Sequence, residues 1–322
     1  MVGGGAAGCV IAARLSEDSS AKVTLLEQGP ADRNPFIHLP VTYYKTAKGD
    51  LLSRYAVEQT TPGRKINYPE MVQGRVLGGG SSVNGMNYMR GNPADYDGWA
   101  QHGAKGWSYE EVLPFFRKSE TNESFAAPAH GTDGPLHVSD QRQTSPLTKA
   151  WLQACQDYGI PYNHDFNSGY QMGCGLYQVM MKNGRRDSSA TAYLNPARSR
   201  PNLTIRTGVQ VDRVIIEDYR AVAVEIEAKG HREILHASQE IIICGGGVGS
   251  PHLLLKSGIG PAEELEQVGV TVAHDLPGVG ENFQDHIDVM LVYDLNGPHS
   301  YDKYKKWYRQ LGAGLQYMMF RN

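Results

Sequence analysis

The residues best suited to chemistry lie at the start of the chain, in a glycine loop with the spacing Gly3-x-Gly5-x-x-Gly8. This spacing permits a tight turn, close approach of the backbone to a diphosphate, and close packing of a helix on a strand. The following helix would offer free N–H groups and a positive dipole to phosphates. Such a loop also occurs as an ordinary turn, but Glu27, at the end of the next apolar run, could accept hydrogen bonds from ribose hydroxyls. The pair predicts a dinucleotide site and does not separate FAD from NAD.

A second glycine-rich segment reads GRVLGGGSSVNGMNYMRG over residues 74–91 and is followed by Asp97. Its glycines would let the backbone lie against a planar ring and its phosphates. Ser81, Ser82 and Asn84 would supply polar groups for ring heteroatoms or ribityl hydroxyls. The alternative is a glycine-rich loop with a purely structural role.

The second segment resembles the first signature of the glucose-methanol-choline (GMC) oxidoreductase family. The run SPHLLLKSGIG at 250–260 resembles another family motif, although Gly246 and Gly247 stand where the family commonly has Gly-Ala. PGVGENFQDH at 277–286 also resembles the family, and we expect structural roles for Asp285 and His286. The resemblance runs from Gly3 to His286 and is closest to choline-dehydrogenase-like members.

The resemblance implies an FAD-dependent oxidoreductase that transfers hydride from a small alcohol to flavin N5. It implies that the first glycine loop holds the diphosphate, Glu27 the adenosine ribose and the Val211 backbone the adenine, with Asn84 to Asn87 beside the flavin. The implied cofactor-binding residues are Gly3, Gly5, Gly8, Glu27, Arg75, Val76, Gly79, Asn84, Gly85, Met86, Asn87 and Val211. Some members attach FAD covalently through a His at the position of Val83, so we expect noncovalent FAD. The electron acceptor, oxygen or a quinone, stays open.

In this family the catalytic base is usually a His in the C-terminal part, and none of the 11 histidines matches that motif. We therefore expect a truncated chain whose base lies beyond Asn322 and which is inactive alone. A non-catalytic FAD-binding module or degenerate paralogue is the alternative. A further alternative is an NAD-dependent dehydrogenase, for which the first glycine loop would be the sole support.

The elements that must position these residues predict an α/β fold: a Rossmann-like FAD-binding domain with an antiparallel meander, plus part of a discontinuous α+β substrate domain. Buried strands are predicted at Lys22–Glu27 and Glu240–Cys244, and alternating apolar residues predict the meander at 204–216, 221–226 and 233–236. A helix should open at Ser250 with Pro251 at its first position and end at Gly258. Another should begin near Ser108, with Pro114 shaping or breaking it, and 305–319 has helical spacing.

The predicted FAD-binding domain comprises residues 1–36, 71–134 and 199–285. Residues 37–70 form a cover loop, part of a long irregular excursion over 31–70, and 135–198 with 286–322 form a partial substrate domain. The net charge of -3 gives no basis for nucleic-acid binding. The four cysteines lack C-x-x-C spacing, so no metal site is expected. No apolar run has the length of a membrane helix. We expect a cytoplasmic protein, with peripheral membrane association left open.

Overall fold

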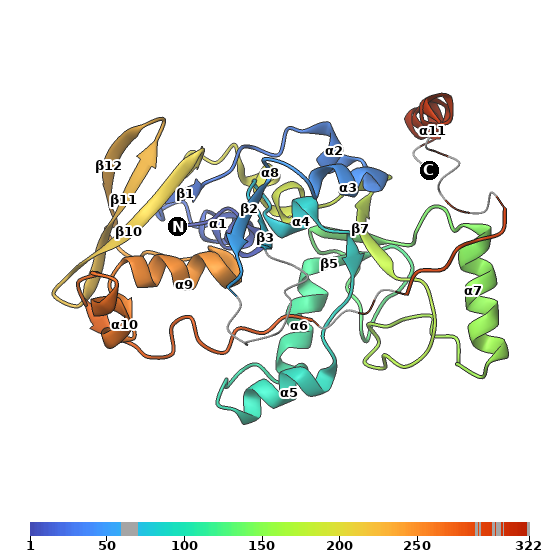
Figure 1. Ribbon diagram of the computed structural model, residues 1–322, viewed down its shortest axis with the longest axis horizontal. Coiled ribbons are helices and arrows are strands. Elements are labelled where there is room, and N and C mark those ends of the chain that lie inside the picture. Colours follow the sequence, from blue (N-terminus) through green and yellow to red (C-terminus); the bar gives the residue numbers. More distant parts are fainter. Residues whose placement is uncertain are drawn as a thin grey trace. The chain divides into compact units, whose positions relative to one another are not determined.

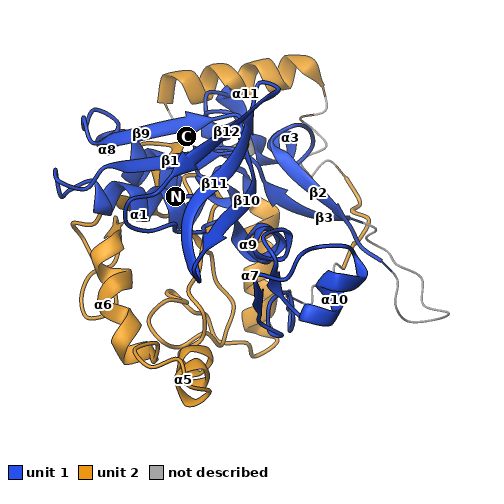
Figure 2. Ribbon diagram, turned by 90° about the vertical axis from the view of Figure 1, so that its left-hand side faces the viewer, with its two compact units in different colours: residues 1–84, 188–286 blue, residues 85–187, 287–322 orange. Residues whose placement is uncertain are grey.

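The computed structural model describes residues 1–58, 70–286, 289, 291–297, 300, 304 and 306–320. The chain forms two compact units, each built from two segments: residues 1–84 with 188–286, and 85–187 with 287–322 (Figure 2). Both units mix helices and strands, as expected for the predicted α/β class (Figure 1). The boundaries differ from the predicted domains, because 85–134 belong to the second unit and 188–198 to the first. The two compact units do not reveal what each one binds. The division into an FAD-binding domain, a cover loop and a partial substrate domain therefore stays a prediction.

The first unit has a small parallel sheet at its centre. Strand β1 (Val23–Glu27) confirms the first predicted strand and pairs in parallel with β9 (Leu203–Thr207). On its other side, Val2 forms parallel bridges to both Leu26 and Ile243. The predicted strand Glu240–Cys244 is therefore reduced to one bridge, since Val2 is the residue that pairs with it. The glycine loop leaves this sheet directly after Val2.

An antiparallel meander follows, formed by β10 (Val209–Glu217), β11 (Arg220–Ala228) and β12 (His231–His236). The predicted run 204–216 is divided, because Gly208 takes φ +69° and separates β9 in the parallel sheet from β10 in the meander. One face of the meander packs on helix α9 (Gly246–Lys256), as Figure 1 shows. The buried side chains of this core are Val2, Leu26, Val209, Val211, Val214, Val224, Ile226 and Leu253.

Helix α9 begins four residues earlier than predicted, at Gly246 rather than at Ser250. Pro251 consequently lies inside the helix. A proline there removes only the hydrogen bond to the carbonyl of Gly247, in the first turn, so the helix tolerates it. The predicted end is confirmed, since Gly258 has φ +79° directly after the C-cap residue Ser257.

The excursion over 31–70 is more regular than predicted in its described part, and residues 59–69 lie outside the description. It contains α2 (Pro35–His38), η1 (Pro40–Thr42), α3 (Tyr43–Thr46) and β2 (Leu52–Ala56). Strand β2 pairs antiparallel with β3 (Glu70–Gly74), a partner far enough along the chain that local pattern does not reveal it. The remaining elements of the first unit are α1 (Ala6–Leu15), α4 (Gly80–Val83), η2 (Ala190–Leu194), α8 (Asn195–Ala197), β13 (Ile259–Gly260), α10 (Ala262–Gln267) and β14 (His274–Asp275).

The second unit is built around a sheet in the order β4-β7-β6-β5, with β8 paired to β7. Its strands are β4 (Asn87–Tyr88), β5 (Glu120–Asn122), β6 (Leu136–Ser139), β7 (Gln178–Lys182) and β8 (Arg185–Arg186). Its helices are α5 (Pro93–Gln101), α6 (Tyr109–Ser119), α7 (Pro146–Asp157) and α11 (Trp307–Phe320).

Helix α6 confirms the predicted start at Ser108. The Ser108 backbone N–H donates to Glu111 Oε2 at 3.0 Å, as a capping box requires. The helix continues through Pro114 without ending there. Among the described residues, no helix is both long and apolar enough to cross a bilayer.

Candidate cofactor-binding site

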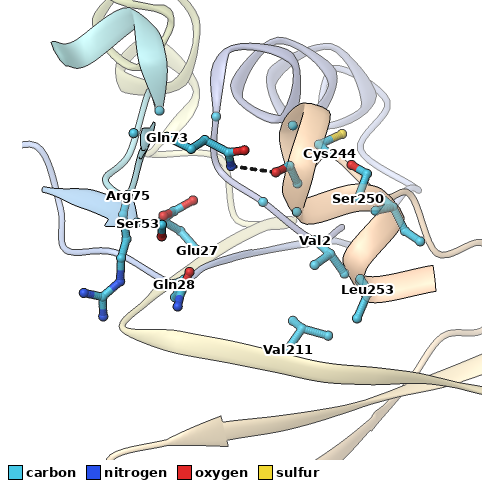
Figure 3. Close-up of a pocket in the computed structure, with 18 of the residues that line it drawn as sticks. Val2, Glu27, Gln28, Ser53, Gln73, Arg75, Val211, Cys244, Ser250 and Leu253 are labelled. Atoms are coloured by element: carbon cyan, nitrogen blue, oxygen red, sulfur yellow. Dashed lines mark hydrogen bonds between the residues drawn. The ribbon is translucent and has the colours of Figure 1, made fainter. Parts of the chain in front are cut away.

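A cavity of about 960 Å³ lies in the first unit, where the glycine loop meets β1, the β2–β3 hairpin, β10 and the start of α9 (Figure 3). Six of the predicted cofactor residues line it: Gly3, Gly5, Glu27, Arg75, Gly79 and Val211. The first turns of both α1 and α9 also face it, through residues that include Ala6, Ala7, Gly246 and Gly247. The sequence motifs thus meet in one cavity, although they come from distant parts of the chain.

The three glycines of the first loop differ in what surrounds them. Gly3 has φ +96°, and a Cβ there would collide with the carbonyl of Cys244. A Cβ at Gly8 would collide with the carbonyl of Gly3, so this glycine permits close packing of α1 on the loop. At Gly5, by contrast, a Cβ would lie 3.9 Å from the carbonyl oxygen of Cys244, which is its nearest contact beyond the adjacent residues in the described part of the chain. The fold does not need a glycine at this position, so the open space above Gly5 fits a ligand backbone such as a diphosphate.

Two helix N-termini face this cavity. The N-cap residues, Gly5 for α1 and Gly245 for α9, provide no side-chain cap, and neither helix has an acidic residue in its first turn. The N–H groups of a first turn have no partner within their own helix. Together with the positive ends of both dipoles, they would attract an anion.

Glu27 is fixed at the end of β1 with its carboxylate almost fully buried. Its Oε2 accepts a hydrogen bond from the Gly4 N–H at 2.7 Å, and its Oε1 accepts one from the Gly29 N–H at 2.8 Å. Burial raises the pKa of Glu27, while these two hydrogen bonds and the charge of Arg75 act in the opposite direction. Each carboxylate oxygen keeps a second lone pair, so both can still accept a hydroxyl.

The β2–β3 hairpin brings polar side chains to the cavity that the sequence motifs did not predict. Gln73 Nε2 donates to the carbonyl of Gly245 at 2.7 Å and thereby joins β3 to the start of α9 (Figure 3). Ser53 and Gln28 also line the cavity. The Nε of Arg75 is buried and has no hydrogen-bond partner in the described part of the chain. An alternating pattern across the hairpin was the available signal, but its two strands are separated by residues 57–69.

Other predicted residues lie away from this cavity. Val76 is fully buried and packs with Ile37, Leu52 and Val83. Gly85, Met86 and Asn87 belong to the second unit, and Met86 takes φ +67°. Asn84 ends α4, where its N–H donates to Gly80 O at 2.8 Å. The placement of Asn84 to Asn87 beside a flavin stays a prediction.

Ser81 and Ser82, predicted to serve a ring, are already engaged within the chain. Their hydroxyls donate to the carbonyls of Gly78 and Leu77 at 2.6 and 2.7 Å. Asp285 Oδ1 accepts from the His286 N–H at 2.8 Å, and both side chains are exposed. The described residues contain no group of three His, Cys, Asp or Glu side chains placed to hold a metal.

Known proteins resemble this chain in sequence and in structure. A family model described as GMC oxidoreductase matches residues 1–288. Mitochondrial choline dehydrogenase of Mus musculus is 40% identical over 325 residues, which cover 99% of this chain and 54% of that protein. Alcohol dehydrogenase (acceptor) of Pseudomonas putida is 42% identical over 301 residues, covering 92% of this chain and 54% of that protein.

Among solved structures, an FAD-dependent oxidoreductase from Chaetomium thermophilum superposes with a TM-score of 0.80 at 31% identity. The match covers 88% of this chain and 51% of the other. The chain thus spans about half the length of the relatives it matches.

Proposed function

The chain belongs to the GMC oxidoreductase family, as its motifs predicted, and we propose that it is the FAD-holding part of an enzyme that oxidises the CH–OH group of a small alcohol. The observation that carries this proposal is the open space above Gly5, at a helix N-terminus that faces the same cavity as the fixed Glu27 carboxylate. When bound, FAD would supply the two-electron acceptor for alcohol oxidation.

The cavity fits the adenosine diphosphate half of FAD. The N–H groups at the start of α1 would bind the diphosphate, with Gly3 and Gly5 allowing its approach. Glu27 would accept the ribose hydroxyls, and the Val211 backbone would contact the adenine. Arg75 would bring a positive charge to the same cavity. Residues further along, from Gly79 to Asn87, would border the flavin.

The cofactor is proposed to be noncovalent. Val83, at the position where some family members carry a linking His, is 9% exposed and packs with Ile37, Leu52 and Val76. Its side chain has no atom that could bond to the flavin ring. Denaturation with acid should therefore release all flavin into the supernatant, and flavin that stays with the precipitate would contradict this part of the proposal.

The substrate and acceptor are proposed only as classes. A small alcohol, with choline one candidate, follows from the names of the relatives, and oxygen or a quinone is the candidate acceptor. The catalytic base and most of the substrate site are proposed to lie in the part of the longer relatives that this chain does not match. The cytoplasmic location stays a prediction.

The proposal is tested by titrating the chain with FAD and, separately, with NADH. We expect FAD to bind, seen as quenching of its fluorescence, and NADH neither to bind nor to displace it. Binding of NADH with no binding of FAD would overturn the proposal. Alcohol oxidation is then tested with the full gene product that contains this sequence, because a non-catalytic module would bind FAD equally well and oxidise nothing.

A further inference from the structure

The second unit contains a buried cluster of charges that the proposed cofactor cavity does not use. At its centre is His130, whose side chain is 2% exposed. Its Nδ1 lies 2.8 Å from Glu120 Oε1, and its Nε2 lies 2.9 Å from Asp165 Oδ2. Arg90 forms an ion pair with the other oxygen of Glu120. The cluster therefore buries the imidazole, the guanidinium and the Glu120 carboxylate, while the Asp165 carboxylate is 17% exposed.

This geometry favours a charged imidazole. Ionised carboxylates only accept hydrogen bonds, and only the imidazolium has the two N–H groups that would satisfy both of them. Asn122 Nδ2 also lies 3.1 Å from His130 Nδ1. Burial alone lowers the pKa of His130, but the hydrogen bonds that it donates to Asp165 and Glu120, and the charges of these carboxylates, outweigh burial and raise the pKa to about 9. His130 is thus a buried cation at neutral pH.

The hydrogen bonds of His130 continue on both sides until they meet at β4. On the Glu120 side, Asn122 Nδ2 donates to Glu120 Oε1 at 2.5 Å and to Gln178 Oε1 at 2.8 Å. Gln178 pairs with Tyr88 in the ladder between β7 and β4. The chain of contacts from His130 through Glu120 therefore ends on the backbone of β4.

On the Asp165 side, Asp165 Oδ1 accepts the Asn167 N–H at 2.9 Å, and Asn167 Nδ2 donates to the carbonyl of Tyr88 at 3.1 Å. The two sides meet at Tyr88, so the contacts form a closed ring that includes this residue. We call this ring the His130 clasp; its members are Tyr88, Glu120, Asn122, His130, Asp165, Asn167 and Gln178.

The strand that the clasp holds follows a strained turn. Met86 is 4% exposed and has φ +67°, a conformation that costs energy for any residue with a Cβ. Its carbonyl accepts the N–H of Met180, on β7, at 2.9 Å. A Cβ at Gly85 would meet no atom of the other described residues within 4 Å, its two neighbours aside, so the space beside this turn is open in the described structure. Such a turn persists only where its surroundings fix it, and β4 with β7 are those surroundings.

We propose that His130 is a positioning residue, whose charged ring closes the clasp that holds the left-handed turn at Met86 and so fixes Gly85 to Asn87. This inference rests on the proposed function, in which these residues border the flavin. Loss of the imidazolium proton would leave a nitrogen lone pair facing a carboxylate oxygen. The clasp would open on that side, and the turn would relax.

Deprotonation is governed by the groups that face His130. The carboxylates of Glu120 and Asp165 hold the proton, Arg90 offsets part of their charge, and the Tyr88 hydroxyl lies 3.4 Å from Glu120 Oε2. Asp140 joins at the periphery, accepting from Gln178 Nε2 at 2.9 Å. Because the carboxylates dominate, neutralising Asp165 should make the proton easier to remove.

The test follows the visible circular dichroism of the flavin-loaded protein as the pH rises. In the wild type we expect the spectrum to change with a midpoint near pH 9. His130→Gln should show the high-pH spectrum already at neutral pH and no transition, and Asp165→Asn should move the midpoint to lower pH. His137→Gln is the matched control, since His137 bonds to one carboxylate, Asp187, at 3.2 Å and is 30% exposed. It should leave the midpoint unchanged.

The outcomes separate the inference from the proposed function. A wild-type protein that binds no flavin would overturn both. Flavin binding with a wild-type spectrum in His130→Gln, or an unmoved midpoint in Asp165→Asn, would overturn the positioning role alone. If His130→Gln does not fold, the Asp165→Asn variant decides whether His130 has a positioning role. Replacing Asp165 would not shift the midpoint of the spectral change if the role of His130 were merely structural. An equal shift in His137→Gln would also overturn the inference.

Discussion

The carboxylate of Glu27 accepts a hydrogen bond from the backbone N–H of Gly4 at 2.7 Å, so the end of β1 and the glycine loop before α1 are tied together. The second oxygen accepts the N–H of Gly29 at 2.8 Å. The residue proposed to bind ribose thus also shapes the loop proposed to bind the diphosphate. These two roles can be separated by experiment.

Glu27→Gln should impair both roles. An amide has one oxygen, so its NH2 group would face one of the two N–H donors, and a buried donor would lose its partner. We expect the free energy of unfolding to fall by about 1–3 kcal/mol and the affinity for FAD to fall as well. Urea unfolding and FAD titration measure the two effects. Full stability in the variant would show that the hydrogen bonds to Gly4 and Gly29 contribute little.

Gly5→Ala should weaken FAD binding without destabilising the fold. Among the described residues beyond its two neighbours, the added Cβ would come no closer than 3.9 Å to any atom, but it would occupy the space proposed for the diphosphate. Gly98→Ala is the matched control, because Gly98 lies in α5 and a Cβ there also meets nothing within 4 Å. We expect at least a tenfold loss of affinity, about 1.4 kcal/mol, in the first variant and none in the second. Equal affinities would place the diphosphate elsewhere.

Local signals accounted for much of the fold. Ser108 with Glu111 marks the start of α6, and Gly258 marks the end of α9, because capping depends on a few adjacent residues. The first unit's parallel strand and meander follow from apolar patterning. What the sequence could not reveal is non-local pairing, as in the β2–β3 hairpin and its Gln73 bond to Gly245.

The His130 clasp illustrates the same limit. Glu120, His130 and Asp165 have no motif spacing, and they meet only because β5 and the loops around it fold together. From sequence, His130 could be given no role beyond that of an ordinary buried or surface histidine. The cavity residues were accessible because glycine spacing reports backbone geometry directly, whereas a buried ion cluster leaves no comparable pattern.

Stability should depend on pH through the clasp. The pKa of His130 is raised from 6.5 to about 9 in the folded chain, so its contribution is complete below pH 6.5 and is lost as the pH rises through 9. Burial would raise the pKa values of Glu120 and Asp165, but the hydrogen bonds to His130, to Asn122 and to the Asn167 N–H, together with the charges of His130 and Arg90, outweigh it and lower both. Their contribution is present above their ordinary values of 4.5 and 3.8 and is lost in acid. Urea unfolding measured from acid to alkaline pH should show both losses of the free energy of unfolding. His130→Gln should remove the loss that occurs at alkaline pH.

Arg75 should contribute charge to cofactor binding. Its side chain lines the cavity, and its buried Nε has no hydrogen-bond partner in the described part of the chain (Figure 3). Arg75→Met keeps most of the aliphatic length and removes the charge. We expect FAD affinity to fall about tenfold and its dependence on salt to weaken, because one cation facing the phosphates is lost.

Arg54→Met is the matched control for Arg75. Arg54 also lines the cavity, but it pairs with Glu70 across the hairpin at 2.9 Å, and both side chains are largely exposed. Its charge is therefore already balanced, and exposed pairs contribute little. FAD titrations at low and high salt should show a changed salt dependence for Arg75→Met and almost none for Arg54→Met. The same loss in both variants would mean that overall charge, rather than the position of Arg75, governs the affinity.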